Sequence, residues 1–544
     1  MMKYSILVFL TLILFIRCSK DDKPLPSTGG NFVVKQVQID EKTTNNALKG
    51  VSLKPKIVLN FDVVINQNTA LQAIELLQNG TKTELQLEMS SDKKTITLSP
   101  KNNLSPLTSY TFVVRNTLTA ENGERLNAEF STLFSTQIDN SDKFPRISTE
   151  ELLTKVQKQT FAYFWDFAHP AYGMIRERNS SGEVVTSGGT GFGIMALVVG
   201  VERGFITKAQ GLQRVKNIVQ FLKMADKYHG AFSHWYNGNS GKTVPFSTKD
   251  NGADLVETAL LFQGLLTARN YFNDSALHID ITKLYNDVEW NFFRNNQQVL
   301  FWHWSPNYAW DMNLKISGWN ESLIVYVLAA GSSNYAIDLA DYENGWAKNG
   351  AMKNGNSYYN ITLPLGPERG GPLFLSQYSF LGINPNGLTD TYANYETQVK
   401  NHTLINRAYC IANPQNYYGY GPESWGLTAS DNMQGYSAHS PSNDLGVITP
   451  SAALTSMAYT PQESLVALEF FYYKLGDKLW GTYGFKDAYS LDKAWFADSY
   501  IAIDQGPIII GIENHRSGLL WKHFMQSPEI KNGLTKLKFN SPNI

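Results

Sequence analysis

Hydrophobic and polar positions follow two different periods along this chain. Over residues 31–138, short segments such as 56–61 and 109–114 alternate apolar and polar residues. An alternation with a period of two is typical of strands that bury one face. Asn122 followed by Gly123 favours a tight turn between such strands. The pattern therefore predicts a small all-β sandwich in the N-terminal part of the chain.

Beyond residue 148 the apolar positions recur with helical spacing. The segment 253–272 is apolar on nearly all sides, which indicates a helix buried among others. Paired helices over residues 148–544, with long aromatic loops, favour a mainly α domain, an (α/α)6 toroid whose loops build a cleft at one rim. Helices are expected at 150–168, 190–203, 207–228, 253–272, 277–295, 319–331, 334–348, 389–411, 461–475 and 506–525.

The first residues of the chain are expected to form a short secretion signal. Lys3 precedes an apolar run that is too short to span a membrane comfortably, as in a signal peptide over residues 1–18. The run ends at Cys18 and resembles the lipobox of bacterial lipoproteins, although Arg17 stands where a small residue is usual. This resemblance implies lipidation at Cys18 and an outer membrane lipoprotein exposed at the cell surface. A periplasmic or plainly secreted protein is the alternative.

Two linkers are expected on either side of the sandwich. Residues 19–30 are rich in Pro, Gly and charged residues and form a flexible tether. Residues 139–147 connect the sandwich to the helical domain.

Composition narrows the classes of function. The net charge is −1, which gives no sign of a nucleic-acid partner. Two cysteines, Cys18 and Cys410, cannot form a disulfide framework. All 12 Trp lie at or after Trp165, so the two domains are unlike. Aromatic rings can stack on sugar rings, but a large helical core also uses Trp, and composition leaves both uses open.

Three carboxylates open the helix predicted at 253–272. Asp250, Asp254 and Glu257 are spaced i, i+4 and i+7, so a helix would place them on one face. Acids at the start of a buried helix are costly unless they are paired, hydrogen-bonded or in a wet cleft. Either aspartate alone fits an N-terminal cap. The three together favour paired carboxylates in a cleft, the machinery of glycoside hydrolases.

A series of motifs in the second half of the chain carries a family resemblance. The motifs are GPLFLSQYS at 371–379, NRAY at 406–409, GYGPESWGLTASD at 419–431, ITPSAA at 448–453 and IDQGP at 503–507. Over residues 148–540 the chain resembles the bacterial β-1,2-glucanase family (glycoside hydrolase family 144 type), whose catalytic domain is called glycoamylase-like. Ser376 and Ser430 depart from the family pattern, which has His and Cys there. The layout of residues 31–138 resembles bacterial Ig-like domains.

The resemblance implies an (α/α)6 barrel that hydrolyses β-1,2-glucan or sophoro-oligosaccharides with inversion. The family's acidic motif matches Asp250, Asp254 and Glu257, and its further cleft glutamate matches Glu321. Inversion requires one protonated acid and one carboxylate that activates water. We expect Glu321 to be the acid and the group of Asp254 and Glu257 to hold the water. At least one pKa in such a cluster should be raised.

Further residues in the aromatic and Gly-rich loops are expected to bind sugar. For each of them, a role in the core or in the loop scaffold is an equal alternative. His303, His439 and His515 show no metal-ligand spacing, so we expect no catalytic metal and no other cofactor. The expected sugar-binding residues are Trp302, Trp304, Trp319, Gln377, Tyr378, Arg407, Trp425 and Asp431.

Two other functions stay open at this point. A surface glycan-binding lipoprotein without turnover would need the rings but not the clustered acids. A glucosidase or phosphorylase for another linkage could use the same toroid, and a phosphorylase would need a basic phosphate pocket. We expect a monomer that binds a β-glucan or gluco-oligosaccharide, touches the membrane only through its lipid anchor and binds no nucleic acid. The choice between endo and exo cleavage depends on loop shape and is not predicted.

Overall fold

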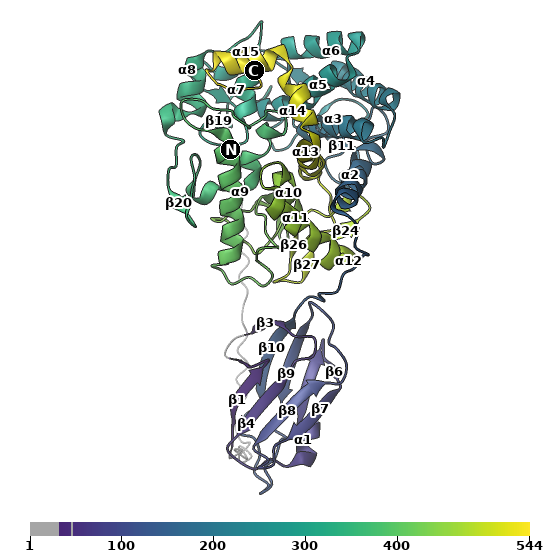
Figure 1. Ribbon diagram of the computed structural model, residues 1–544, viewed down its shortest axis with the longest axis vertical. Coiled ribbons are helices and arrows are strands. Elements are labelled where there is room, and N and C mark those ends of the chain that lie inside the picture. The colour runs from purple at the N-terminus through teal and green to yellow at the C-terminus, as the bar shows by residue number, and fades with distance from the viewer. Residues whose placement is uncertain (1–31, 45–46) are drawn as a thin grey trace, which may run out of the picture. The chain divides into compact units, whose positions relative to one another are not determined.

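The computed structural model describes residues 32–44 and 47–544, which form two compact units with the boundary between Gln137 and Ile138 (Figure 1). The leader, Cys18 and the tether at 19–30 lie outside the described residues. The first unit consists mainly of strands and the second mainly of helices. The prediction of a mainly α protein with a small β domain before the helices is confirmed.

Two five-stranded sheets form the first unit, in the orders β2-β1-β4-β8-β7 and β3-β10-β9-β5-β6. Alternation along β4 buries Ile57 and Leu59, which lie opposite Leu98 and Ile96 of β8 on one face. These side chains share a core with Phe112 of the second sheet. The strands are β1 (Val34–Ile39), β2 (Lys42–Thr43), β3 (Leu48–Val51), β4 (Ile57–Phe61), β5 (Ile74–Gln78), β6 (Thr81–Thr83), β7 (Leu85–Met89), β8 (Thr95–Pro100), β9 (Ser109–Val114) and β10 (Phe130–Thr136).

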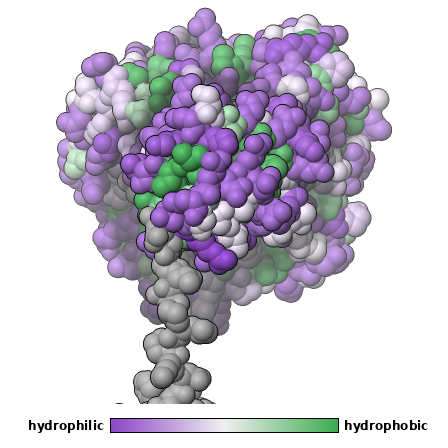
Figure 2. All heavy atoms as spheres, turned by 90° about the horizontal axis from the view of Figure 1, so that it is seen from below, coloured by the Kyte–Doolittle hydropathy of each residue, from purple (hydrophilic) through white to green (hydrophobic). Residues whose placement is uncertain are grey.

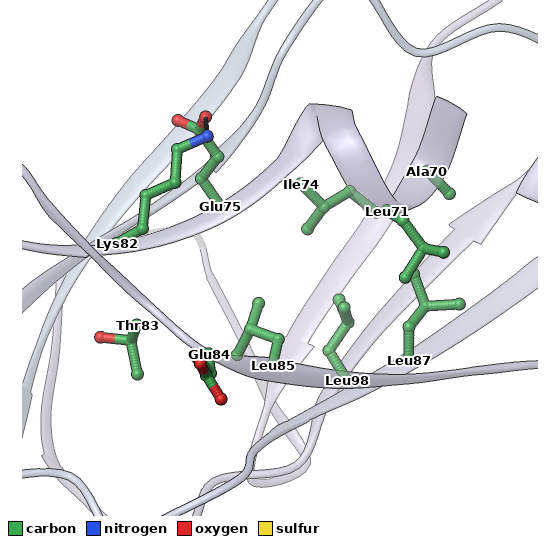
Figure 3. Close-up of a pocket in the computed structure, with 10 residues that line it drawn as sticks. All are labelled: Ala70, Leu71, Ile74, Glu75, Lys82, Thr83, Glu84, Leu85, Leu87 and Leu98. Carbon is green, nitrogen blue, oxygen red and sulfur yellow. Dashed lines mark ion pairs between the residues drawn. The ribbon is translucent and has the colours of Figure 1, made fainter. Parts of the chain in front are cut away.

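A cavity of about 250 Å³ lies beside α1 (Gln67–Ala73), a short helix that the strand pattern did not predict. Leucines from α1, β7 and β8 form much of its wall, and Glu75 pairs with Lys82 at 2.5 Å on its side (Figure 3). None of the described residues that line this cavity is aromatic. It therefore offers apolar contacts but no ring on which a sugar could stack.

Buried helices hold the second unit together. α3 packs against both α5 and α13, and α7 packs against α15. A Cβ atom on Gly191 of α3 would lie 2.1 Å from the backbone oxygen of Leu260 on α5, so only glycine permits this close approach. The helices are α2 (Thr149–Trp165), α3 (Ser187–Glu202), α4 (Lys208–Met224), α5 (Leu255–Phe272), α6 (Ser275–Asn286), α7 (Leu323–Gly331), α8 (Leu339–Asp341), α9 (Tyr395–Ala412), α10 (Pro450–Thr455), α11 (Pro461–Glu469), α12 (Gly476–Leu479), α13 (Ala502–Ser517), α14 (Leu519–Met525) and α15 (Pro528–Lys536).

Several helices end earlier than predicted. The helix expected at 506–525 is two helices, α13 and α14, because Gly518 between them adopts a positive φ of 66°. The helix expected at 277–295 ends at Asn286, and a 3-10 turn follows at Trp290–Arg294. The segment 334–348 forms only α8 and a π-helical turn at Tyr342–Trp346. α10 and α15 were not predicted.

Hydrophilic residues predominate on the face drawn in Figure 2, and apolar residues there form small separate groups. Within the described ranges, no helix combines the length and the hydropathy needed to cross a membrane.

Candidate active site

The N-terminal ends of α3, α5, α7 and α13 meet at a cavity of about 640 Å³ in the second unit. Helix N-termini carry partial positive charge, so this arrangement favours negatively charged groups. Acids, aromatic rings and aliphatic side chains share the wall. The described residues that line it are Glu177, Arg178, Thr186, His234, Trp235, Phe246, Val256, Glu257, Leu260, Trp302, Glu321, Phe374, Tyr378, Ala429, Tyr436, Ala438, Ile501 and Ile503.

Asp254 is the N-cap of α5. Its Oδ1 accepts hydrogen bonds from the backbone N–H groups of Val256 (3.0 Å) and Glu257 (2.9 Å). The helix therefore begins only at Leu255, and Asp250 lies before it. The expectation that one helix face would carry all three carboxylates is wrong, because capping by Asp254 requires an extended backbone at that residue.

His303 joins Asp250 to Asp254 instead. Strand β16 (Ala253–Asp254) pairs with β18 (His303–Trp304), and Asp254 lies opposite His303. The Nε2 atom of His303 lies 3.2 Å from Asp250 Oδ2 and 3.4 Å from Asp254 Oδ2. Burial alone would lower the pKa of His303, but its contacts with the two aspartates raise that pKa to about 10. The imidazole is therefore a cation at neutral pH.

A second imidazole, His234, faces the other side of the cluster. Its Nδ1 lies 3.3 Å from Asp254 Oδ2 and its Nε2 lies 3.8 Å from Glu257 Oε1. The ring stacks on Phe246 with centroids 4.3 Å apart. Burial opposes its positive charge, but Glu257, Asp254 and Asp250 raise the pKa of His234 to about 9. The cluster thus combines three carboxyl groups with two cationic imidazoles.

The pKa values of the two inner carboxyl groups are shifted in opposite directions. Burial would raise the pKa of Asp254, but hydrogen bonds to His234 and His303 and their positive charges hold that pKa well below its usual range. Burial and the negative charge of Asp254 raise the pKa of Glu257, while His234 and the N–H of Gly188 oppose this shift. The Gly188 N–H donates to Glu257 Oε2 at 2.6 Å. Asp254 is therefore a fixed anion, and Glu257 is a more basic carboxylate.

Glu321 lines the cavity just before α7. Its backbone oxygen accepts a hydrogen bond from Ser379 Oγ, and the same hydroxyl accepts one from the Ile324 N–H at 3.0 Å. Burial raises the pKa of Glu321 to about 7, and the charges of Asp254 and Glu257 add to the effect. A carboxyl group that keeps its proton near pH 7 beside ionised ones can act as a general acid.

A second group of acids lies behind the cavity wall. Arg178 Nη1 lies 3.2 Å from both carboxylate oxygens of Asp431, and the Asp431 N–H donates to Asp487 Oδ2 at 2.7 Å. Burial raises the pKa of Asp487 to about 7. Burial and the nearby Asp487 raise the pKa of Asp504 well above its usual range. Asp487 and Asp504 are both 2% exposed, so this pair retains a proton, and Asp487 holds the backbone of Asp431 through the hydrogen bond from its N–H.

The predicted sugar-binding residues do not all reach the cavity. Trp302 and Tyr378 line it, and Asp431 contacts Arg178, which lines it. The other five predicted residues are not among the described residues of the lining: Trp304, Trp319, Gln377, Arg407 and Trp425.

These five side chains have other contacts. Trp319 and Trp425 are buried, with 7% and 0% of their surface exposed, and Trp304 packs edge-on against His229. Gln377 Nε2 donates to the backbone oxygen of Ala452, and Arg407 Nε donates to that of Pro422. Their side chains therefore pack in the core or stabilise the loops.

Several lining residues were missed by the sequence reasoning. Trp235 is the first residue of β14 (Trp235–Asn237), and His234 directly precedes it. Arg178 lies in a loop that is far from the acidic motif in the sequence. Tyr436 belongs to the hairpin of β22 (Ala429–Asn432) and β23 (Gly435–Ala438). The one available signal was a histidine beside two aromatic residues at 234–236, shortly before Asp250.

The cluster also contains donor atoms of the kind that hold metals. One ligand atom each from His234, Asp250 and Asp254 lies within 4.8 Å of the others. The carboxylate oxygens of both aspartates already face the imidazolium of His303. These contacts supply the positive charge that a cation would bring, and the expectation of no catalytic metal stays a prediction.

Comparisons with known proteins identify relatives of both units. The family described as "Putative glucoamylase" matches residues 313–528, and the family described as "Bacterial Ig-like domain" matches residues 34–136. The endo-β-1,2-glucanase of Chitinophaga pinensis, solved with sophorotriose and glucose, is 51% identical, with a TM-score of 0.72 over 73% of this chain and 100% of that one. The β-1,2-glucanase of Parabacteroides distasonis is 35% identical, with a TM-score of 0.70 over 94% of this chain and 74% of that one.

A curated relative from Parabacteroides distasonis differs in specificity from the endo-β-1,2-glucanase of Chitinophaga pinensis. It is an exo β-1,2-glucooligosaccharide sophorohydrolase acting at the non-reducing end, and it is 43% identical over 420 residues. The match covers 72% of this chain and 58% of that protein, so the chain spans less than two thirds of the length of this relative.

Proposed function

We propose that this chain, which belongs to the β-1,2-glucanase family of the Chitinophaga pinensis enzyme, is a glycoside hydrolase that cleaves β-1,2-glucan or its oligosaccharides with inversion. One observation carries the proposal. A single cavity holds Glu321, which lies just before α7 and has a pKa of about 7, together with Glu257 from the first turn of α5. These are the two carboxyl roles that hydrolysis of an acetal requires.

The contacts of each carboxyl group assign its role. Glu321 donates its proton to the glycosidic oxygen as the bond to the anomeric carbon breaks. Glu257 takes a proton from a water molecule whose oxygen attacks the anomeric carbon from the opposite face, and this inverts the configuration. Asp254 is unsuited to hold this water, since it is 1% exposed and both of its oxygens already accept hydrogen bonds or ion pairs.

Asp254 and Asp250 support the reaction through charge. Together they keep His234 and His303 protonated, and His234 in turn favours the ionised form of Glu257. This proposal assigns the water to Glu257 alone, whereas the sequence led us to expect that Asp254 and Glu257 hold it together.

The helices of residues 148–544 form an (α/α)6 toroid in this proposal. Two observations support it: α3, α5, α7 and α13 direct their N-termini to one cavity, and α3 packs between α5 and α13. Inner helices of a toroid are expected to be apolar on all sides, as α3 and α5 are.

Neither rival function matches the described lining of the cavity. A binding protein without turnover has no need for a buried acid with a pKa near 7. A phosphorylase needs a basic pocket, but Arg178 is the one Lys or Arg among the described lining residues, and it is engaged by Glu177 and Asp431.

A separate part of the proposal concerns location. The protein is lipidated at Cys18, acts as a monomer at the outer membrane surface and contacts the membrane only through this anchor. The apolar leader that ends at Cys18 supports this. A Cys18→Ala variant should move from the membrane fraction to the soluble fraction after cell lysis, and membrane retention of that variant would contradict the lipid anchor.

The hydrolytic proposal is tested with linear β-1,2-glucan. Product sizes resolved by chromatography should show short β-1,2-glucooligosaccharides with the wild-type protein and far smaller amounts with Glu321→Gln after the same time. Equal turnover by both proteins, or no turnover by the wild type, would contradict it. The same product sizes distinguish endo from exo cleavage.

A further inference from the structure

Arg178 is held rigidly at the edge of the cavity. Its backbone bridges to Ile501 at the start of α13, and its N–H donates a hydrogen bond to Ser181 Oγ at 3.3 Å. Its Nε donates to Glu177 at 2.9 Å and its Nη1 donates to Asp431 at 3.2 Å. Two of the three guanidinium nitrogens are therefore fixed in direction by carboxylates.

The third nitrogen remains available. Within the described part of the chain, Nη2 of Arg178 makes no hydrogen bond, and it is not among the buried nitrogen atoms that lack a partner. The side chain is 28% exposed and lines the cavity. A planar guanidinium whose orientation is already fixed loses little entropy when it donates once more.

An aromatic ring accompanies this donor. In the β22–β23 hairpin, Tyr436 lies directly opposite Asp431, so the two side chains project from the same face. Tyr436 lines the same cavity and is 48% exposed. Asp431 is itself anchored by Ser499 Oγ and by its N–H bond to Asp487. A polar edge formed by Arg178 and a flat ring from Tyr436 match the hydroxyl edge and the apolar face of a hexose.

The linkage of the substrate determines which of its hydroxyl groups are free to accept a hydrogen bond from Arg178. This step rests on the proposed function. In a β-1,2-linked glucan the 2-oxygen of an internal unit is part of the linkage, so the remaining pair of adjacent free hydroxyls is at C3 and C4. We propose that Arg178 is a substrate-binding residue whose Nη2 donates to this 3,4-diol of a glucosyl unit packed on Tyr436, with Asp431 as the residue that positions it.

A purely structural role is the competing explanation, because the Arg178–Asp431 pair also ties the hairpin to the loop before β11 (Val184–Thr186). The two roles separate in kinetics. A binding role raises KM with little change in kcat, whereas a displaced hairpin would also lower kcat and the melting temperature. Hydrogen bonds to a charged group support an expected increase of about 10–100-fold in KM for Arg178→Gln. Arg178→Lys should recover only part of the loss, since lysine lacks the planar fork.

The experiment measures KM, kcat and melting temperature for the full chain with β-1,2-glucooligosaccharides. Arg294→Gln is the matched control, because it removes an Arg–Asp pair with a similar distance (3.3 Å to Asp341) outside the cavity lining. Binding is also measured by calorimetry in the Glu321→Gln background, where turnover is removed. There, Arg178→Gln should weaken binding by the same 10–100-fold.

A hydroxyl-deletion series completes the test. Oligosaccharides with a 3-deoxy or 4-deoxy unit placed at each position in turn should bind more weakly to the Glu321→Gln protein at one position. That loss should vanish when Arg178→Gln is added. A KM within twofold of wild type for Arg178→Gln, or equal losses for the deoxy series with and without Arg178, would overturn the assignment. If the wild-type protein does not hydrolyse the glucan at all, the proposed function fails instead, and the two failures are distinct.

Discussion

The raised pKa of Glu321 leads to a quantitative prediction about pH. A glutamate at its ordinary pKa of 4.5 would be protonated in roughly one molecule in 300 at pH 7, whereas a pKa of about 7 gives roughly one in two. The fold thus supplies about 150 times more of the acid form at neutral pH. The main cause is burial at the cavity wall, and the charges of Asp254 and Glu257 add to it.

The sign of the pH effect follows from the role of the group. A general acid must carry its proton, so kcat/KM should decline as pH rises through about 7 and should fall about tenfold for each further pH unit. Initial rates on β-1,2-glucooligosaccharides between pH 5 and pH 9 measure this decline, which forms the alkaline limb of the pH profile. Glu321→Gln should reduce kcat by about 10²–10⁴-fold and remove the alkaline limb from the residual activity.

An activated substrate separates acid catalysis from other losses. An aryl β-sophoroside with a nitrophenyl leaving group needs no proton from the enzyme, so Glu321→Gln should lose far less activity on it than on the glucan. An alkaline limb that persists in Glu321→Gln, or equal losses on both substrates, would refute the assignment of Glu321 as the acid.

Three other predictions concern the base, the helix packing and the first unit. Glu257→Gln should lower kcat by about 10²–10⁴-fold while KM changes little, and undiminished turnover would exclude Glu257 as the base. Gly191→Ala should lower the free energy of unfolding by about 1–3 kcal/mol in urea titrations, because its Cβ would lie 2.1 Å from the Leu260 oxygen, whereas Gly421→Ala, with no atom within 4 Å, should change stability little. A protein containing residues 142–544 should keep its turnover of short oligosaccharides, and a folded but inactive truncation would show that the first unit is needed for activity.

The sequence predicted the fold where its periodicity was strong. The alternating strands predicted at 56–61 and 109–114 correspond to β4 and β9, and the apolar segment 253–272 forms α5 from Leu255 onward. The match to the β-1,2-glucanase family, drawn from the motifs of the second half, is confirmed. The ends of helices were harder to predict from the sequence, since Gly518 could equally lie inside one long helix or separate two helices.

The candidate site was predicted in part. Glu257 could be found because it lies at the start of an apolar helix, where an acid is conspicuous, and Glu321 because it matches the further cleft glutamate of the family. His303 could not be assigned, because its contact with Asp254 depends on the pairing of two short strands nearly fifty residues apart. For Trp319 and Trp425 the sequence left sugar binding and a core role open, since composition alone does not tell a stacking ring from a packed one, and the structure places both in the core.

The most direct test of the account is the anomeric configuration of the first product. Linear β-1,2-glucan is hydrolysed in an NMR tube, and the anomeric protons of the new reducing ends are followed before mutarotation mixes them. Attack of a water held by Glu257, opposite the proton donor Glu321, predicts that the α-anomer appears first. Initial appearance of the β-anomer, or glucan that stays intact, would contradict the central claim.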